Sequence, residues 1–133
     1  PLLSPFASLT RFAPTRHLPT SVLSAVLLGR WSTPELRRTL HAALDDVAPA
    51  VQRARAAAAM RIDLSDRLPR IAVPTLSLKA NQDRLLRAGA SRQLIESIHH
   101  ARQVALDGPH LLLQTRTDAC VQAIAGFVTM LRD

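Results

Sequence analysis

The sequence is poor in aromatic residues, with no tyrosine, one tryptophan and three phenylalanines among 133 residues. A hydrophobic core must therefore be built from aliphatic side chains, and few rings are available to stack on nucleic-acid bases. Cysteine is equally scarce, because Cys120 is the only one. No disulfide can form within the chain, which fits a reducing, cytoplasmic compartment.

Long hydrophobic runs are also missing. The longest, VLSAVLL at 22–28, is far shorter than the about 20 apolar residues that a membrane helix needs. No signal peptide is recognisable, and no group of His, Cys, Asp and Glu has the spacing of a zinc site. We therefore expect no membrane partner, no metal and no organic cofactor.

Lysine is nearly absent, so the formal net charge of +7 comes almost wholly from arginine. An arginine-rich nucleic-acid binder is one interpretation, which a salt-dependent binding titration tests. The arginines are scattered along the chain and form no basic run, however, and we expect no nucleic-acid partner. Together with the many alanines and leucines, the arginine bias is typical of a GC-rich bacterial genome.

The first half of the sequence predicts a helical region, residues 1–67. A proline-rich, irregular lead-in is expected at 1–20. Helices are then expected in three stretches: 21–28, 32–47 and 49–62. The second has the clearest start, because Thr33 can cap the helix and Pro34 suits its first turn.

In the second half, residues 68–133, the spacing of apolar residues alternates between the patterns of strands and of helices. Strands are expected at 71–80 and 102–107, and helices at 90–100 and 117–132. Such alternation indicates parallel strands joined by right-handed crossovers, and hence an α/β fold. The last helix, with Thr117 as its cap, has one apolar face predicted to point inward: Cys120, Ile124, Phe127, Val128 and Leu131.

Two parallel strands are too few for a stable sheet, since parallel sheets have several strands and are covered on both faces. We therefore expect this chain to be an incomplete part of a larger sheet. The open strand edge is predicted to be covered by a missing N-terminal half or by a homodimer partner.

Asp83 and His110 are the main candidates for chemistry, because each follows one of the two predicted strands. In open parallel sheets, functional groups gather at the carboxyl ends of the strands. A carboxylate beside a histidine orients the imidazole and stabilises its protonated form. Taken singly, Asp83 also fits an ordinary turn residue, and His110 also fits a packing residue.

Other polar residues are assigned structural roles. His99 and His100 are expected to end a helix, where a positive charge suits the helix dipole. Asp45 and Asp46 are expected on the solvent face of a helix, and Asp107 in a turn.

From residue 68 onward, the stretch LPRIAVPTLSLKANQDRLLRAGASRQLIESIHHARQVALDGPHLLLQTRTDACVQAIAGFV resembles the C-terminal part of the α/β-hydrolase superfamily. The order of a VPTL strand, an acid loop, a helix, a short strand, a histidine turn and a closing helix carries the resemblance. It covers about half the chain. The resemblance implies that the preceding helices form a cap or lid.

The resemblance implies that Asp83 is the acid and His110 the general base of a Ser-Asp-His triad. The nucleophile of this superfamily precedes the acid, yet no G-x-S-x-G occurs in this sequence, so the serine and the oxyanion hole are expected upstream. Two residues depart from the common pattern: Ala80 stands where many members have glycine, and Pro109 directly precedes the histidine.

We therefore predict a fragment of an α/β-hydrolase-fold serine hydrolase acting on a small ester-like substrate, inactive as an isolated chain. The alternative is a non-catalytic, hydrolase-like fragment or paralogue that acts by binding or assembly. Five apolar side chains of the cap could line an acyl pocket, although packing between cap and core is the favoured interpretation: Leu23, Val26, Leu27, Trp31 and Met60.

Overall fold

The structure, a computed structural model, describes residues 19–86 and 89–132. The lead-in predicted at 1–20 therefore lies almost wholly outside the described residues. In chain order the described elements, with η for a 3-10 helix, are α2 (Thr20–Leu27), η1 (Gly29–Trp31), α3 (Pro34–Asp45), α4 (Pro49–Arg61), η2 (Ser65–Arg70), β1 (Thr75–Ala80), α5 (Ala90–Ser97), β2 (Ala101–Leu106), α6 (Leu112–Thr115) and α7 (Thr117–Met130).

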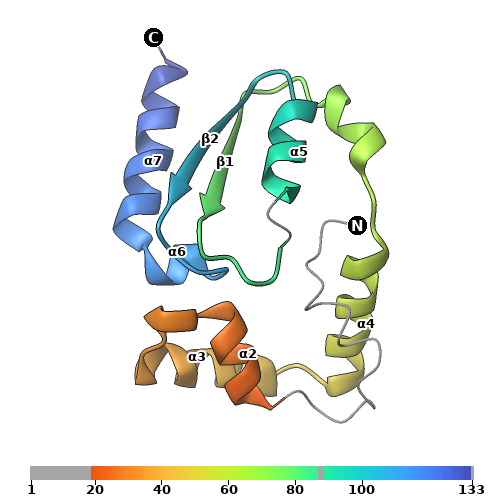
Figure 1. The fold of residues 1–133 in the computed structure, drawn as a ribbon, viewed down its shortest axis with the longest axis vertical. Helices are drawn as coiled ribbons and strands as arrows, with labels where there is room; N and C mark the ends of the chain where they lie inside the picture. The colour runs from red at the N-terminus through yellow and green to blue at the C-terminus, as the bar shows by residue number, and fades with distance from the viewer. Residues whose placement is uncertain (1–18, 87–88, 133) are drawn as a thin grey trace.

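Strands β1 and β2 pair in parallel, with Thr75 opposite Ala101 and Ala80 opposite Leu106. The described part of the chain contains no further strand in this sheet. Helices α5 and α7 each contact both strands, and the sheet lies between these two helices (Figure 1). The prediction of an α/β fold is confirmed at this level.

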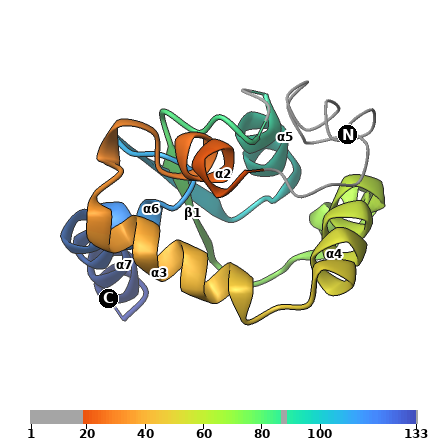
Figure 2. The ribbon, with the colours of Figure 1, turned by 90° about the horizontal axis from the view of Figure 1, so that it is seen from below.

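Both strands run toward α2 and α6, so their carboxyl ends lie at the end of the sheet nearest to these helices (Figure 1). From below, α2 is seen close to this end, while α3 leads away from it to α4 (Figure 2). The residues that follow each strand are therefore brought between the sheet and the first helices of the chain.

The three helices predicted in the first half are present. Thr33 caps α3 as expected, because its hydroxyl accepts a hydrogen bond from the backbone N–H of Leu36 at 3.1 Å. The alanine-rich α4 has no buried residue. Its formation reflects the high helix propensity of alanine and arginine more than packing.

Several boundaries differ from the predictions. Strand β1 begins at Thr75, after Pro74, because proline offers no N–H to a ladder. Helix α5 ends at Ser97, since Ile98 is extended. The prediction that His99 and His100 end this helix is therefore wrong; both lie exposed in the turn before β2.

The inward face predicted for the last helix is only partly correct. Cys120 is fully buried, whereas Ile124, Val128 and Leu131 are exposed. Thr117 is the first residue of α7, and its hydroxyl donates to the Leu113 carbonyl at 2.7 Å instead of capping the helix. The helix is therefore covered at its beginning, at Cys120, and its apolar stripe is exposed further along.

The buried apolar core is small and lies around the carboxyl ends of the strands. Leu28 from the end of α2 is fully buried, as are Pro109 and Cys120. Ala90 and Leu112 are also buried there, whereas the buried Ile98 directly precedes β2 and lies near the other end of the sheet. This core joins the first helical segment to the loop after β2, and so supports the part of the fold that carries the candidate residues.

Candidate active site

The loops that follow β1 and β2 lie side by side because the two strands are parallel neighbours. The backbone N–H of Asn81 donates to the Leu106 carbonyl at 2.9 Å, and that of Gln82 donates to the Gly108 carbonyl at 3.0 Å. The ladder thus continues beyond the strands into both loops. Asp83 comes directly after Gln82 in one loop, and His110 comes two residues after Gly108 in the other.

The Asp83 carboxylate and the His110 imidazole are hydrogen-bonded. Nδ1 of His110 lies 2.9 Å from Oδ2 of Asp83, and their side chains are 27% and 15% exposed, respectively. Because an ionised carboxylate only accepts hydrogen bonds, Nδ1 carries the hydrogen in this contact. The other ring nitrogen, Nε2, is then the atom that can take up a proton.

The second oxygen of Asp83 holds its own loop. Oδ1 accepts hydrogen bonds from the backbone N–H groups of Leu85 at 2.7 Å and Leu86 at 2.9 Å. This is the turn role that aspartate commonly plays. The two interpretations of Asp83 from the sequence are therefore compatible, because one oxygen stabilises the turn while the other faces the histidine.

The surroundings of Asp83 favour its charged form. Partial burial raises its pKa, but the hydrogen bonds from His110, Leu86 and Leu85 and the charge of a protonated His110 outweigh that effect. The pKa of Asp83 is therefore lowered from its ordinary value. An ionised carboxylate at this position can stabilise an imidazolium in direct contact with it.

The turn that presents His110 is held by close packing. A Cβ atom on Gly108 would lie 2.5 Å from Cδ1 of Leu112 and 3.0 Å from Cγ of Arg116. Only glycine fits so near the first turn of α6 without a shift of its neighbours. Pro109, which departs from the pattern of the resembled superfamily, is fully buried here and acts as a packing residue.

A cavity of about 470 Å³ lies beside the carboxylate and the imidazole. Its lining residues come from β1, α5, the start of α6 and both loops, and they include Leu78, Ala80, Asp83, Leu94, His110 and Leu112. None of the five apolar cap residues considered for an acyl pocket lines it. Ser77 and Ser91 do, but neither is hydrogen-bonded to His110, so the described residues contain no serine and histidine pair poised for attack.

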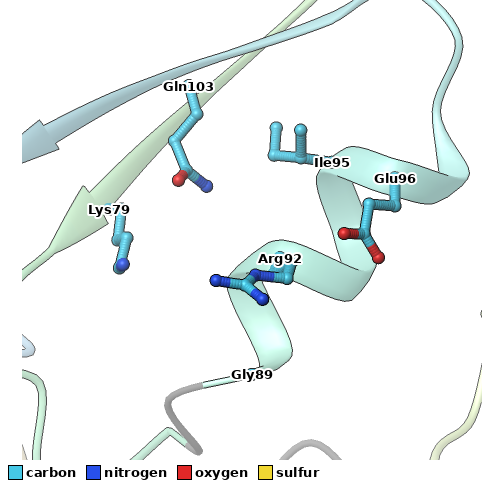
Figure 3. A pocket seen from close by; sticks show the side chains of 6 residues that line it. All are labelled: Lys79, Gly89, Arg92, Ile95, Glu96 and Gln103. Atoms are coloured by element: carbon cyan, nitrogen blue, oxygen red, sulfur yellow. The ribbon is translucent and has the colours of Figure 1, made fainter.

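A second cavity, of about 480 Å³, lies between the sheet and α5. Lys79 and Gln103 extend from the two strands, and the guanidinium of Arg92 reaches toward them from α5 (Figure 3). Among its lining residues there is no histidine, serine, threonine or cysteine. Within the described ranges, no group of His, Cys, Asp and Glu could hold a metal ion.

Three further polar residues meet near the histidine turn, and the sequence did not indicate that they do. Asp107 accepts a hydrogen bond from Nη2 of Arg30 at 2.8 Å, and its other oxygen accepts one from Nε2 of Gln82. Asp107 does lie in the turn where it was expected. Its partners were not predictable, because Arg30 is 77 residues away and no local pattern marks such a pair.

The fold and the site define an α/β protein with a carboxylate and imidazole pair at the carboxyl ends of two parallel strands. No family description and no curated protein matches the sequence. Among solved structures, a hydrolase from Oleispira antarctica is similar to this chain, with a TM-score of 0.74 and 20% sequence identity. The match covers 83% of this chain and 41% of that chain.

At this level of identity the likeness concerns the fold. The chain spans less than half the length of the hydrolase it matches. Among the described helices, none combines the length and the apolar character that crossing a bilayer requires.

Proposed function

We propose that this chain is the C-terminal part of an α/β-hydrolase fold and supplies the acid and the base of a cytoplasmic serine hydrolase that acts on carboxylic esters. Asp83 orients and stabilises His110, and His110 is the general base. The nucleophilic serine and the oxyanion hole belong to polypeptide that precedes these residues. The 133-residue chain by itself is inactive on esters.

The contact between His110 Nδ1 and Asp83 Oδ2, at 2.9 Å, is the observation that carries this proposal. It joins two residues from the ends of neighbouring parallel strands, which is where open α/β sheets hold their functional groups. Both residues line one cavity. The similarity to a protein from Oleispira antarctica named as a hydrolase adds support at the level of the fold.

The chemistry follows from the orientation of the ring. The serine hydroxyl attacks the ester carbonyl carbon as its proton passes to Nε2 of His110, and the imidazolium then gives that proton to the departing alcohol. Water attacks the acyl-serine in the second half of the reaction, using the same base. Throughout, the ionised Asp83 accepts from Nδ1 and stabilises the positive charge of the ring.

We also propose that residues 1–67 belong to a cap over the site and that the preceding half of the protein completes the sheet. Main-chain groups alternate in direction along a strand. Because the N–H groups of Thr75 and Asn81 donate to His100, just before β2, and to Leu106, at the end of β2, the alternate residues Leu76, Leu78 and Ala80 direct their main-chain groups to the other edge of β1. That edge is where a further strand adds.

Ester hydrolysis by the longer polypeptide tests the proposal. The protein with its native upstream region is expected to hydrolyse p-nitrophenyl acetate and to react with a fluorophosphonate probe at an upstream serine. His110→Gln is expected to abolish both activities, since it removes the base. His99→Gln, which alters an exposed histidine outside the site, serves as the matched control.

Unchanged turnover in His110→Gln would contradict the proposal. The alternative of a non-catalytic, hydrolase-like module draws on the absence of G-x-S-x-G from this sequence. An upstream region that completes the sheet but reacts with no fluorophosphonate would support that alternative against the enzyme.

A further inference from the structure

The Asp107 carboxylate connects three segments that are far apart in the sequence. Oδ2 accepts from Nη2 of Arg30 in η1 at 2.8 Å, and Oδ1 accepts from Nε2 of Gln82 in the loop after β1. Asp107 itself directly follows β2. A single carboxylate thus binds both loops of the candidate site and the first helical segment of the chain.

These contacts lie close to Asp83 and His110 in the sequence. Gln82 precedes Asp83, and Asp107 begins the turn that ends at His110. The backbone N–H of Gln82 also donates to the Gly108 carbonyl at 3.0 Å. Any separation of the two loops must therefore break the side-chain bond between Gln82 and Asp107 as well as this backbone bond.

The first helical segment is hydrogen-bonded to the other end of the same turn. The backbone N–H of Leu111 donates to the Leu27 carbonyl at 3.1 Å. Arg30 approaches from the adjoining η1, and its guanidinium lies 4.3 Å from the centre of the Trp31 ring. The ring restricts the arginine side chain, so less freedom is lost when it binds Asp107.

We propose that Arg30, Asp107 and Gln82 form a clamp that positions the His110 turn against Asp83. Asp107 is a positioning residue in this role and takes no part in proton transfer. The clamp also makes the geometry of the acid and base pair depend on the helical segment at residues 20–31, which belongs to the proposed cap. This inference rests on the proposed roles of Asp83 and His110.

The strength of the clamp is limited by solvent. The side chains of Arg30 and Asp107 are 68% and 55% exposed, and exposed ion pairs are weak and screened by salt. We therefore expect the clamp to change the balance between arrangements of His110 by roughly two- to fivefold, and not to decide whether the chain folds.

The tautomer of His110 gives a direct readout in the protein with its native upstream region. Long-range ¹H–¹⁵N correlation spectra distinguish a hydrogen on Nδ1 from one on Nε2 when the ring is neutral. With the clamp intact, the Nδ1–H form is expected to dominate, because Nδ1 donates to Asp83. In Asp107→Ala the ratio of Nδ1–H to Nε2–H is expected to fall roughly two- to fivefold.

Two further variants separate positioning from general destabilisation. Arg30→Met retains the aliphatic contact but removes the ion pair, and it is expected to produce part of the same fall. The double variant Arg30→Asp with Asp107→Arg is expected to restore the ratio, because Gln82 can accept from an arginine as well as donate to a carboxylate. Asp45→Ala, at the exposed end of α3, is the control that removes one negative charge elsewhere.

A tautomer ratio that is equal in the wild type, Asp107→Ala and Arg30→Met would overturn the clamp. If Asp107→Ala does not fold, Arg30→Met and the double variant decide the question alone. A different result would overturn the proposed function: an unchanged His110 spectrum in Asp83→Asn means that no acid and base pair exists. The two failures are therefore distinguishable in one set of spectra.

Discussion

The carboxylate of Asp83 stabilises its own turn and has, in the proposed site, a second task beside His110. Oδ1 closes the turn with Leu85 and Leu86, while Oδ2 accepts from His110. Because the turn holds Oδ1 in place, it also fixes the position of Oδ2. A substitution that preserves the turn but changes the second contact can therefore separate the two tasks.

Asp83→Asn is such a substitution. The amide oxygen can still accept from Leu85 and Leu86, but the amide N–H₂ faces Nδ1 of His110 and donates to it, so the hydrogen of the ring moves to Nε2. In the longer protein we expect kcat for an ester to fall by about 10⁴-fold, as a reversed tautomer does in a triad. Steady-state kinetics measure this, with Asp45→Asn as the control.

A small change of kcat in Asp83→Asn, together with an unaltered ring spectrum, would contradict the assigned role of the carboxylate. The unfolding free energy of Asp83→Asn checks the turn itself. It should change by less than the free energy that corresponds to the fall in kcat.

The lowered pKa of Asp83 predicts a pH dependence of stability. Because the folded state holds the carboxylate more strongly ionised than the unfolded state does, its stabilising contribution is present above the unfolded pKa, about 4, and is lost as the pH falls through the folded pKa. Urea unfolding of wild type and Asp83→Asn from pH 6 to pH 3 measures it.

The free energy difference between these two proteins is expected to shrink toward the acid end of this range. Comparison with the variant is needed because the pKa of Asp63 is also lowered, by hydrogen bonds from Ser65. A difference that stays constant or grows with acid would contradict the assignment to Asp83.

At the scale of elements, the turn between β2 and α6 positions the histidine, and its tightness comes from Gly108. The helix that follows begins only four residues later, at Leu112, so turn and helix share one small volume. A second glycine, Gly126 in α7, has no atom within 4 Å of a Cβ built on it. A Cβ atom would therefore clash with its neighbours at Gly108 but would have open space at Gly126.

Gly108→Ala is expected to destabilise the chain by about 1–3 kcal/mol, since the new methyl group overlaps Leu112 and Arg116. Gly126→Ala is the matched control and is expected to stabilise it by about 0.5–1 kcal/mol, because alanine favours the helix interior. Urea denaturation monitored by circular dichroism measures both. Equal effects in the two variants would contradict the packing argument.

For the molecule as a whole, exposure of apolar surface is the dominant feature. The outer part of α7 exposes Val121, Ile124, Val128 and Leu131, and β1 has one edge without a strand partner in the described ranges. Open edges of parallel strands invite pairing with another chain. The isolated 133-residue chain is therefore expected to self-associate.

Leu76→Pro tests whether the edge of β1 is responsible. Proline removes the N–H that points away from β2 and leaves the β1 and β2 ladder intact, so edge pairing should be blocked. Leu76→Ala keeps that N–H and is the control for the lost leucine side chain. Sedimentation velocity over a range of concentrations should show less association for the proline variant than for the alanine variant.

Equal association of the two variants would assign the effect to other exposed surface, such as the outer face of α7. Association that is absent from the wild type as well would contradict the importance of the open edge for the isolated chain.

The sequence by itself determined the features that depend on neighbouring residues. Alternating strand and helix patterns, the Thr33 cap and the placement of Asp83 and His110 after successive strands follow from backbone propensities and turn chemistry, which act over a few positions. Because parallel strands end at one edge, this local order was enough to predict that the two side chains meet.

Only the tertiary structure decided which side chains of an apolar helix are covered and which distant charges pair. Ile124 and Val128 follow the same pattern as Cys120 yet are exposed, because burial depends on what packs against the helix. No local sequence pattern marks the ion pair between Arg30 and Asp107 either. It depends on two segments that are brought together in the fold, where Leu111 also donates a backbone hydrogen bond to Leu27, and contacts of that kind exist only once the chain has folded.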